Sequence, residues 1–435
     1  MPNELPLNWC ECKFSDVCDI YTGNSINEQE KASKYTNLDS GYNYIGTKDI
    51  SFEQTIDYEN GVKIPFDNGT FKIAPKNTPL LCIEGGSAGR KLAFTEEEVC
   101  FGNKLCAFVS KNKITNLYIF YLLQSTAFRS IFSLNKNGLI GGVSLNKIKS
   151  LELYLPPLRE QERIVEKIEA LFAGIDEGVE RLKSAQAQIK QYRQSVLKSA
   201  FEGKLYKTTE WKEVQLKNVC EPVIKRKITN DENEIFQYVD ISSINNKTLR
   251  IEKPECINGK IAPSRARQII HTNDVVFSTV RTYLMNIAYV PEALDNQIAS
   301  TGFCVIRGKK DRLNGKFIFY KSISNDFLNH LNQLQYGAVY PAVRDKDVLE
   351  QFVTLPSLPE QQRIVEEIEK RFAVADELEK AVNEGLEKAE KLKQSILKKA
   401  FAGKLVAQDP NDEPASVLLE RIKKEKQFQT KGKKK

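Results

Sequence analysis

The sequence predicts an α+β protein in which two mixed α/β domains are joined by two long antiparallel coiled-coil helices with pseudo-two-fold symmetry. Three observations predict this class: a long helical segment that occurs twice, a heptad pattern of apolar residues in each copy, and two blocks of similar size that each precede one copy. The expected parts are a first domain over 1–154, a helical spacer over 155–208, a second domain over 209–354, a second spacer over 355–422 and a basic disordered tail over 423–435.

The repeated segment covers residues 155–205, which return without a gap as residues 355–405. Roughly half of the aligned positions are identical, and the agreement is concentrated at the two ends of the segment. Prolines at the start of each copy oppose a helix upstream, and Gly203 and Gly403 can take the left-handed conformation that ends one. A helix from Glu160 to about Phe201 would be about 60 Å long, so each copy is interpreted as a rod that spaces the two domains.

Apolar residues in both copies follow the heptad spacing of a coiled coil. We expect this seam to comprise Ile164, Ile168, Leu171, Ile175, Gly178, Leu182, Ala185, Ile189, Tyr192 and Val196 in the first copy, and Ile364, Ile368, Phe372, Ala375, Leu378, Val382, Ala389, Leu392 and Ile396 in the second. If the helices pair in antiparallel fashion, the second returns the chain to its beginning. The alternative is two separate amphipathic helices, each packed on its own domain.

The composition describes a globular chain of 435 residues, 41% hydrophobic and 28% charged, that is long enough to bury sizeable cores. No apolar stretch approaches a membrane span and the start lacks a signal-peptide pattern, so we expect a cytoplasmic protein without a membrane anchor. The nine cysteines form no Cys-x-x-Cys pair and are interpreted as reduced core thiols. A metal site from Cys10, Cys12 and Cys18 is the alternative, but this spacing matches no structural zinc pattern.

The two non-repeated blocks are expected to share one fold with different surfaces. They align faintly, with Trp9 matching Trp211 and Cys106 matching Cys304. Short β-rich runs at 79–85, 104–110, 275–290 and 302–308 predict strands, and runs at 116–132 and 313–334 have helical spacing. Each block is therefore predicted to be a curved sheet flanked by a few helices.

The sequence gives little support for catalysis. The two histidines, His271 and His330, lack a carboxylate or nucleophile at a useful spacing. The glycine cluster at 85–91 lacks the phosphate-loop spacing, so a tight turn is favoured over a nucleotide site. Glu160 and Asp176, like their copies in the second helix, are more typical of the charged flank of a coiled coil than of paired catalytic acids. The chain is therefore interpreted as a binding protein, not an enzyme.

Basic, polar and aromatic residues that occur together in turns are the candidate DNA contacts. Arginine can recognise guanine through two hydrogen bonds, asparagine can recognise adenine, and Ser, Thr, Lys and Tyr can bind phosphates. Each residue taken alone is by default an ordinary surface residue, and the cluster is more persuasive than its members. The candidates are Ser87, Arg90, Lys91, Asn135, Lys136 and Asn137 in the first block, and Ser264, Arg265, Arg267, Ser278, Thr279, Arg281, Tyr283, Tyr336, Tyr340 and Arg344 in the second.

The two helical segments carry a distinctive family resemblance. LPPLREQERIVEKIEALF with SVLKSAFEGKL, and LPSLPEQQRIVEEIEKRF with SILKKAFAGKL, resemble the helical regions of type I restriction-modification specificity subunits. APSRARQIIHTNDVVFSTVRTYL in the second block resembles one class of target-recognition domain in that family, whereas the first block departs from it. The resemblance implies a non-catalytic subunit that recognises a bipartite, asymmetric double-stranded DNA target, one half-site per domain, with the helices as a ruler.

The resemblance also implies partners. Two methyltransferase subunits, which use S-adenosylmethionine, and two motor and nuclease subunits, which use ATP and magnesium, would assemble around the helices, whereas this chain would hold no cofactor or metal itself. The candidate partner contacts are Leu158, Arg163, Ile164, Phe201, Leu358, Arg363, Ile364 and Phe401, although some of these must instead close the coiled coil. The alternatives are a coiled-coil assembly scaffold that does not recognise DNA sequence, and a self-sufficient nuclease or methyltransferase, against which the missing motifs argue.

Overall fold

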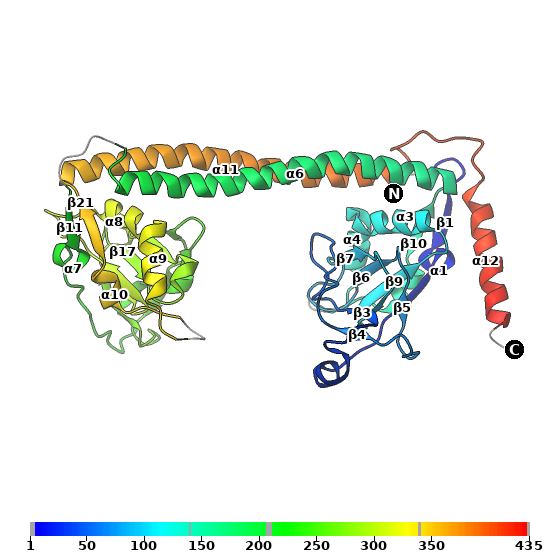
Figure 1. The fold of residues 1–435 in the computed structure, drawn as a ribbon, viewed down its shortest axis with the longest axis horizontal. Helices are drawn as coiled ribbons and strands as arrows, with labels where there is room; N and C mark the ends of the chain where they lie inside the picture. Colours follow the sequence, from blue (N-terminus) through cyan, green and yellow to red (C-terminus); the bar gives the residue numbers. More distant parts are fainter. Residues whose placement is uncertain (1–4, 139–140, 206–210, 338–340, 433–435) are drawn as a thin grey trace. The chain divides into compact units, whose positions relative to one another are not determined.

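The computed structural model describes residues 5–138, 141–205, 211–337 and 341–432, with side chains described up to residue 426. The chain divides into two compact units, Met1–Arg181 with Gly385–Lys435 (unit 1) and Leu182–Glu384 (unit 2). The long helices α6 (Leu158–Phe201) and α11 (Leu358–Ala400) each contribute one half to each unit (Figure 1). Each unit therefore consists of one α/β domain and two half-helices, and unit 1 also contains the C-terminal segment.

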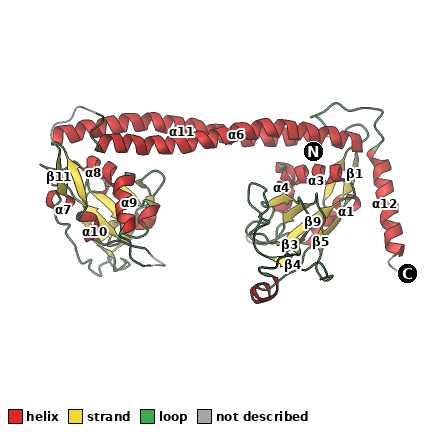
Figure 2. Cartoon of the chain, in the orientation of Figure 1, coloured by secondary structure: helices red, strands yellow, loops and turns green. Residues whose placement is uncertain are grey.

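Unit 1 begins with a short strand and helix and continues through two sheets before three helices lead to α6 (Figure 2). Its elements are β1 (Cys10–Lys13), α1 (Phe14–Val17), β2 (Asp19–Thr22), α2 (Glu28–Glu30), the π-helical turn η1 (Lys31–Tyr35), β3 (Tyr42–Ile45), β4 (Lys63–Ile64), β5 (Ile73–Ala74), β6 (Pro79–Cys82), β7 (Leu92–Phe94), β8 (Val99–Phe101), β9 (Leu105–Val109), α3 (Lys113–Gln124), α4 (Thr126–Leu134), α5 (Leu145–Ser150), β10 (Glu152–Leu155) and α12 (Ala415–Gly432).

Unit 2 follows the same order of sheets and helices. Its elements are β11 (Lys212–Gln215), α7 (Leu216–Val219), β12 (Ile235–Val239), the 3-10 turn η2 (Ile241–Ser243), β13 (Ile244–Asn245), β14 (Arg250–Ile251), β15 (Glu255–Asn258), β16 (Ala266–Ile270), β17 (Val275–Ser278), η3 (Thr282–Leu284), β18 (Ile287–Tyr289), η4 (Glu292–Leu294), β19 (Gln297–Ser300), β20 (Phe303–Ile306), α8 (Gly315–Ser322), α9 (Asn325–Gln333), α10 (Asp345–Leu349) and β21 (Phe352–Leu355).

The sheet topologies show that the two domains share one fold, as predicted. One sheet has the order β4-β3-β8-β5 in unit 1 and β15-β12-β19-β16 in unit 2, and in each the central pair is parallel while the other pairs are antiparallel. The other sheet has the order β2-β9-β6-β7 in unit 1 and β18-β17-β20 in unit 2. The first and last strands of each domain pair antiparallel, β1 with β10 and β11 with β21, so each domain begins and ends beside one long helix.

A serine divides each of the two runs with helical spacing into two helices. Ser125 ends α3 and caps α4, because its hydroxyl oxygen accepts a hydrogen bond from the backbone N–H of Phe128 at 3.2 Å. Ser324 occupies the same place between α8 and α9 in unit 2. Serine is favoured at this position because it satisfies an amide that the helix cannot.

The half-helices pair in antiparallel fashion within each unit, which confirms the coiled-coil prediction. In unit 1, the start of α6 packs on the end of α11, with Ile164, Ile168, Ile396 and Ala400 in one apolar cluster that also includes Trp9. In unit 2, Val196, Leu197, Ile364 and Ile368 form the corresponding contact between the end of α6 and the start of α11. Arg193 adds ion pairs to Asp376 at 2.5 Å and Glu379 at 2.7 Å.

Part of the predicted seam is wrong. The side chains of Tyr192, Leu378 and Leu392 are 42%, 53% and 52% exposed, and Gly178 is also exposed. Pairing of two helices buries only a narrow face of each helix. Near the helix ends, apolar residues also pack on the adjacent domain. A strict heptad pattern continued from the ends along the helix therefore departs from the face that contacts the partner helix.

Matching hydrogen bonds attach the start of each long helix to its domain. The indole N–H of Trp9 donates to Glu160 at 2.9 Å, and that of Trp211 donates to Glu360 at 3.1 Å. The amide group of Gln161 donates to the carbonyl of Pro156 at 2.9 Å, a bond that its counterpart in the second copy repeats. These contacts account for the agreement of the two copies at their start, where Glu160 and Glu360 meet equivalent tryptophans.

The C-terminal segment forms a helix where a disordered tail was predicted from residue 423. Ala415 and Leu419 of α12 are buried in the core of the unit 1 domain, and the Lys426 ammonium donates to the carbonyls of Ser15 and Cys18 at 2.8 and 3.1 Å. The prediction gave too much weight to the lysines, because the apolar residues at the start of the segment dock the helix. None of the helices in the described ranges is long and apolar enough to cross a membrane.

The N-terminal residues and the C-terminal segment are joined within unit 1. The Leu7 amide donates to the side chain of Gln408 at 3.1 Å, and the Ala415 amide donates to the carbonyl of Asn8 at 2.9 Å. Asp412, whose side chain is 2% exposed, pairs with Arg163 of α6 at 2.6 Å. The end of the chain therefore closes unit 1 beside its beginning.

The cysteines are free thiols, and seven of the nine are buried, as expected for core thiols. Cys10 is half-buried and Cys256 is exposed, so these two depart from that prediction. Burial raises the pKa of the Cys106 thiol to about 12. Across the described residues, no group of three or more potential ligands is arranged to hold a metal ion.

Candidate nucleic-acid interface

In unit 2, Arg281 lies in a rigid turn after β17. Its backbone is left-handed (φ 48°), and its amide donates to the carbonyl of Pro341 at 2.8 Å. The next residue, Thr282, is buried and donates from its hydroxyl to Asn332 of α9 at 2.6 Å. A left-handed conformation is costly for a residue with a side chain, so the surrounding bonds fix the position of this arginine. Tyr283, beside it, is 54% exposed.

Ser278 and Thr279 do not fit their predicted role. Both are buried, and their hydroxyls donate to the carbonyls of Val280 and Gly302 at 3.0 Å each. Strand β17, which ends at Ser278, is buried along its whole length, and Thr279 is only 8% exposed, so the structure leaves neither hydroxyl free to reach a phosphate. Their contribution is to anchor the base of the turn that carries Arg281.

The other arginine cluster of unit 2 lies next to this turn. Ser264, Arg265 and Arg267 are exposed at the start of β16, where the Arg267 Nε donates to the carbonyl of Ser264 at 2.8 Å. The carbonyl of Arg265 accepts the amide of Thr301, and the amide of Thr279 donates to the neighbouring Gly302. The structure therefore places the two predicted arginine clusters at adjacent positions.

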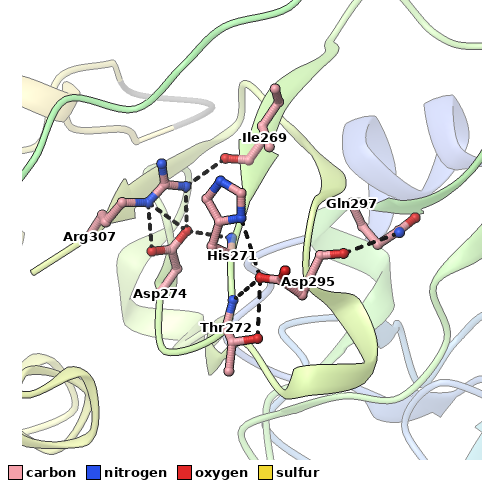
Figure 3. A network of polar contacts seen from close by, with 7 residues as sticks. All are labelled: Ile269, His271, Thr272, Asp274, Asp295, Gln297 and Arg307. Carbon is pink, nitrogen blue, oxygen red and sulfur yellow. Dashed lines mark hydrogen bonds and ion pairs between the residues drawn. The ribbon is translucent and has the colours of Figure 1, made fainter.

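A polar network fixes the connection between β16 and β17 (Figure 3). Arg307 binds the Asp274 carboxylate through Nε and Nη2, at 2.9 and 2.7 Å, and also donates to the carbonyl of Ile269. The side chains of Arg307 and Asp274 are only 11% and 2% exposed. Asp295 accepts the amide of Thr272 at 2.8 Å and contacts His271. The ends of both strands are thus held in one fixed geometry.

The third cluster of unit 2 is only partly described. Tyr336 is 56% exposed, and the Arg344 guanidinium lies over its ring at 5.1 Å. Arg344 also binds Asp347, which lowers the pKa of that carboxyl group. Tyr340 lies outside the described residues. Because its guanidinium is paired with Asp347, Arg344 would have to give up this ion pair, at least in part, to contact DNA.

In unit 1, the glycine cluster forms a tight turn between β6 and β7, as favoured from the sequence. Gly89 (φ +76°) packs so closely on Phe132 that a Cβ atom would lie 2.5 Å from its ring. Arg90 is exposed and Ser87 is half-buried, whereas the Lys91 ammonium donates to the carbonyl of Thr47 at 2.8 Å. Lys91 therefore fastens this turn to the 46–56 segment.

The candidates at 135–137 lie beside that turn. Asn135 uses its amide group to donate to the carbonyl of Ile131 at 2.7 Å, which is a helix-capping role. The amide of Asn137 donates to Gly142, and Val143 then donates to Ile83 at 2.9 Å. Unit 2 has the same two backbone hydrogen bonds. The amide of Tyr336 donates to the carbonyl of Ala342, and the amide of Val343 donates to the carbonyl of Thr279. The same loops carry the candidates in both domains, with different side chains.

Two residues of unit 1 were missed from the sequence. Lys104 is exposed in the turn before β9. Burial raises the pKa of the Cys82 thiol, whereas a hydrogen bond to the backbone of Glu84 and the positive charges of Lys91, Lys104 and Lys136 oppose this increase. Phe52 is 53% exposed and lies under Arg90 and Lys91. Neither residue lies close to the other candidates in sequence. Only the register of β6 with β9 could have indicated Lys104, and only the fold of the 46–56 segment could have indicated Phe52.

A family model described as a type I restriction modification DNA specificity domain matches residues 6–184 and 208–388. The chain belongs to this family. The two matched stretches each contain one domain and the first part of the long helix that follows it, so the internal repeat of the structure is also a repeat of the family unit.

Curated relatives in this family match over nearly the full length. The EcoKI specificity subunit of Escherichia coli (strain K12) is 28% identical, over 97% of this chain and 96% of its own length. The EcoBI specificity subunit of Escherichia coli is 26% identical, over 96% and 92% respectively. A chain from a solved structure of the type I R-M system has a TM-score of 0.69 at 20% identity and covers 93% of this chain and 100% of that one, which supports the fold.

The candidate partner contacts of this type I specificity chain fall into two groups. Ile164, Ile364 and Phe201 are buried against the protein's own core, at 0%, 1% and 7% exposure, so those three predictions are not supported. Half-buried residues among the candidates also make internal contacts, because Arg163 pairs with Asp412 and Phe401 packs edge-on against Tyr118 at 5.3 Å. The accessible candidates that remain are Leu158 and Leu358, which are half-buried, and Arg363, which is exposed.

Proposed function

We propose that this chain is the DNA sequence-specificity subunit of a type I restriction-modification complex. In this function each domain recognises one half of a bipartite, asymmetric DNA target, and the long helices set the distance between the half-sites. The chain itself is non-catalytic. The observation that carries the proposal is that two domains of one topology present different side chains from the same loops. Two related but unlike domains should recognise two unlike half-sites.

Partner subunits would perform the chemistry. The proposal gives this chain two methyltransferase subunits, which bring S-adenosylmethionine, and two motor and nuclease subunits, which use ATP and magnesium. The exposed parts of the helix starts, including Arg363, are the proposed contacts. A similar chain of known structure supports this, because it comes from a study of complex assembly in the type I R-M system.

The test is binding of the full chain, mixed with its methyltransferase partner, to duplexes that contain the split target found by mapping methylated adenines in the host. The complex should bind the cognate duplex and discriminate against versions with one scrambled half-site or an altered gap. Affinity should also fall steeply with salt, because phosphate contacts release counterions. Equal binding to cognate and scrambled duplexes would contradict the proposal, and indifference to the gap would contradict the ruler.

A further inference from the structure

We propose that Phe52 is a positioning residue for Arg90 in recognition of the half-site bound by unit 1. This inference rests on the proposed function. Phe52 lies at the tip of a tight hairpin that begins at Ile50 and returns at Ile56. The Arg90 Cζ lies 4.9 Å from the centre of the Phe52 ring, and the Lys91 Nζ lies 5.3 Å from it.

The hairpin is rigid enough to hold the ring in place. Ile50 is fully buried in the domain core, and Asp49 accepts the amide of Gly46 at 2.8 Å. The amide of Ser51 donates to the carbonyl of Thr55 at 3.0 Å, which closes the tip. From the opposite side, Lys91 donates to the carbonyl of Thr47 at 2.8 Å. The exposed ring is therefore supported from below and from the neighbouring turn.

Arg90 is the group that this ring can organise. Its side chain is exposed and has no carboxylate partner in the described part of the chain. An unrestrained arginine loses considerable rotamer entropy when it binds. A cation held on an aromatic face keeps its hydrogen-bond donors at the rim available, so Phe52 would reduce the entropy that Arg90 loses on binding guanine or phosphate.

Unit 2 uses the same arrangement with different chemistry. Its hairpin of β13 and β14 contacts the turn after β17, where the Asn246 side chain donates to the carbonyl of Leu284 at 3.0 Å. In both domains a hairpin tip thus braces the turn that carries an arginine candidate. In unit 1 the brace contacts the cationic side chain itself, whereas in unit 2 it contacts the backbone.

The experiment measures binding of the full chain with its methyltransferase partner to the cognate duplex and to duplexes with either half-site scrambled. Phe52→Ala should weaken cognate binding about 2- to 5-fold, the value of an exposed cation–π contact. Arg90→Ala should weaken it more, about 5- to 150-fold. Phe52→Tyr should retain wild-type affinity because it keeps the aromatic face, and Phe52→Leu should behave as the alanine variant does.

A double-mutant cycle separates positioning from direct contact. In the Arg90→Ala background, Phe52→Ala should have no further effect, and its effect in the wild-type background should vanish when one particular half-site is scrambled. Phe66→Ala is the matched control, since Phe66 is 64% exposed in the same unit but packs against Tyr42; it should leave binding unchanged. Thermal unfolding should confirm that each variant is folded.

Three results would overturn the inference. Wild-type affinity for Phe52→Ala would remove any role, additive losses in the double variant would show that Phe52 contacts DNA by itself, and retained affinity for Phe52→Leu would show that only apolar bulk matters. Each of these leaves the proposed function standing if the wild type still discriminates between cognate and scrambled duplexes. Loss of that discrimination in the wild type would overturn the proposed function and this inference together.

Discussion

Removal of the Asp274 carboxylate should selectively destabilise unit 2. This carboxylate receives three close donors, Nε and Nη2 of Arg307 and the backbone amide of His271 at 2.8 Å. Asp274→Ala leaves the buried guanidinium with the carbonyl of Ile269 as its remaining acceptor. Breaking a buried ion pair on one side costs about 3–5 kcal/mol, so we expect a loss of that size in the free energy of unfolding of unit 2.

Denaturant unfolding, followed together with hydrogen exchange of peptides from each unit, measures this loss. Protection should fall in the peptides that contain β16 to β20, whereas unit 1 should be unchanged. Because the penalty comes from an unpaired charge, Asp274→Ala combined with Arg307→Met should recover most of the lost stability. A loss below about 1 kcal/mol in the single variant, or no recovery in the double variant, would refute this reasoning.

Three further outcomes follow from particular contacts. Burial raises the pKa of Glu160, and one of its carboxylate oxygens has no hydrogen-bond partner among the described atoms. The free energy of unfolding should therefore fall as the pH rises from the usual glutamate pKa through the raised folded-state value. In denaturation measured at several pH values, E160Q should remove this dependence, whereas E360Q, at the less buried counterpart, should change it little. Leu419→Ala should cost unit 1 about 2–4 kcal/mol because Leu419 is 8% exposed, whereas Val417→Ala, at 37% exposure, should leave the melting temperature nearly unchanged. Arg281→Ala should weaken recognition of one half-site by about 1–3 kcal/mol in the duplex-binding assay, and unchanged discrimination would exclude a base contact.

The long helices could be predicted closely from the sequence because their periodicity extends over many turns. The expected helix over about 160–201 agrees with α6, Leu158–Phe201. The burial of Tyr192 and Leu378 in the seam was predicted wrongly, because the heptad pattern of one helix does not show which of its residues the partner helix covers. The helix at the C-terminus was missed because its docking residues come before a lysine-rich stretch.

The sequence indicated which loops carry the candidate residues better than it indicated which individual side chains are exposed. Arg281 and Arg90 were proposed because cations in turns are conspicuous in sequence, and their contact with DNA stays a prediction. The burial of Ser278 was not anticipated, because β17 is buried along its length and gives no alternation that would separate inner from outer residues. Thr279 directly follows this strand and is also buried. Phe52 could not be found, because its relation to Arg90 depends on how a distant hairpin folds over the turn.

The bonds that join the first residues to the last segment have a consequence for synthesis on the ribosome. Unit 2 is one uninterrupted stretch, Leu182–Glu384, whereas unit 1 needs Gly385–Lys435 to supply its second half-helix and α12. Because translation proceeds from the N-terminus and compact units generally fold as wholes, we expect the domain made first to mature last. Until α12 has been synthesised, the nascent polypeptide would expose the apolar surface that Leu419 later covers. The first domain, rather than the second, would therefore be the part of the protein most in need of chaperone protection during synthesis.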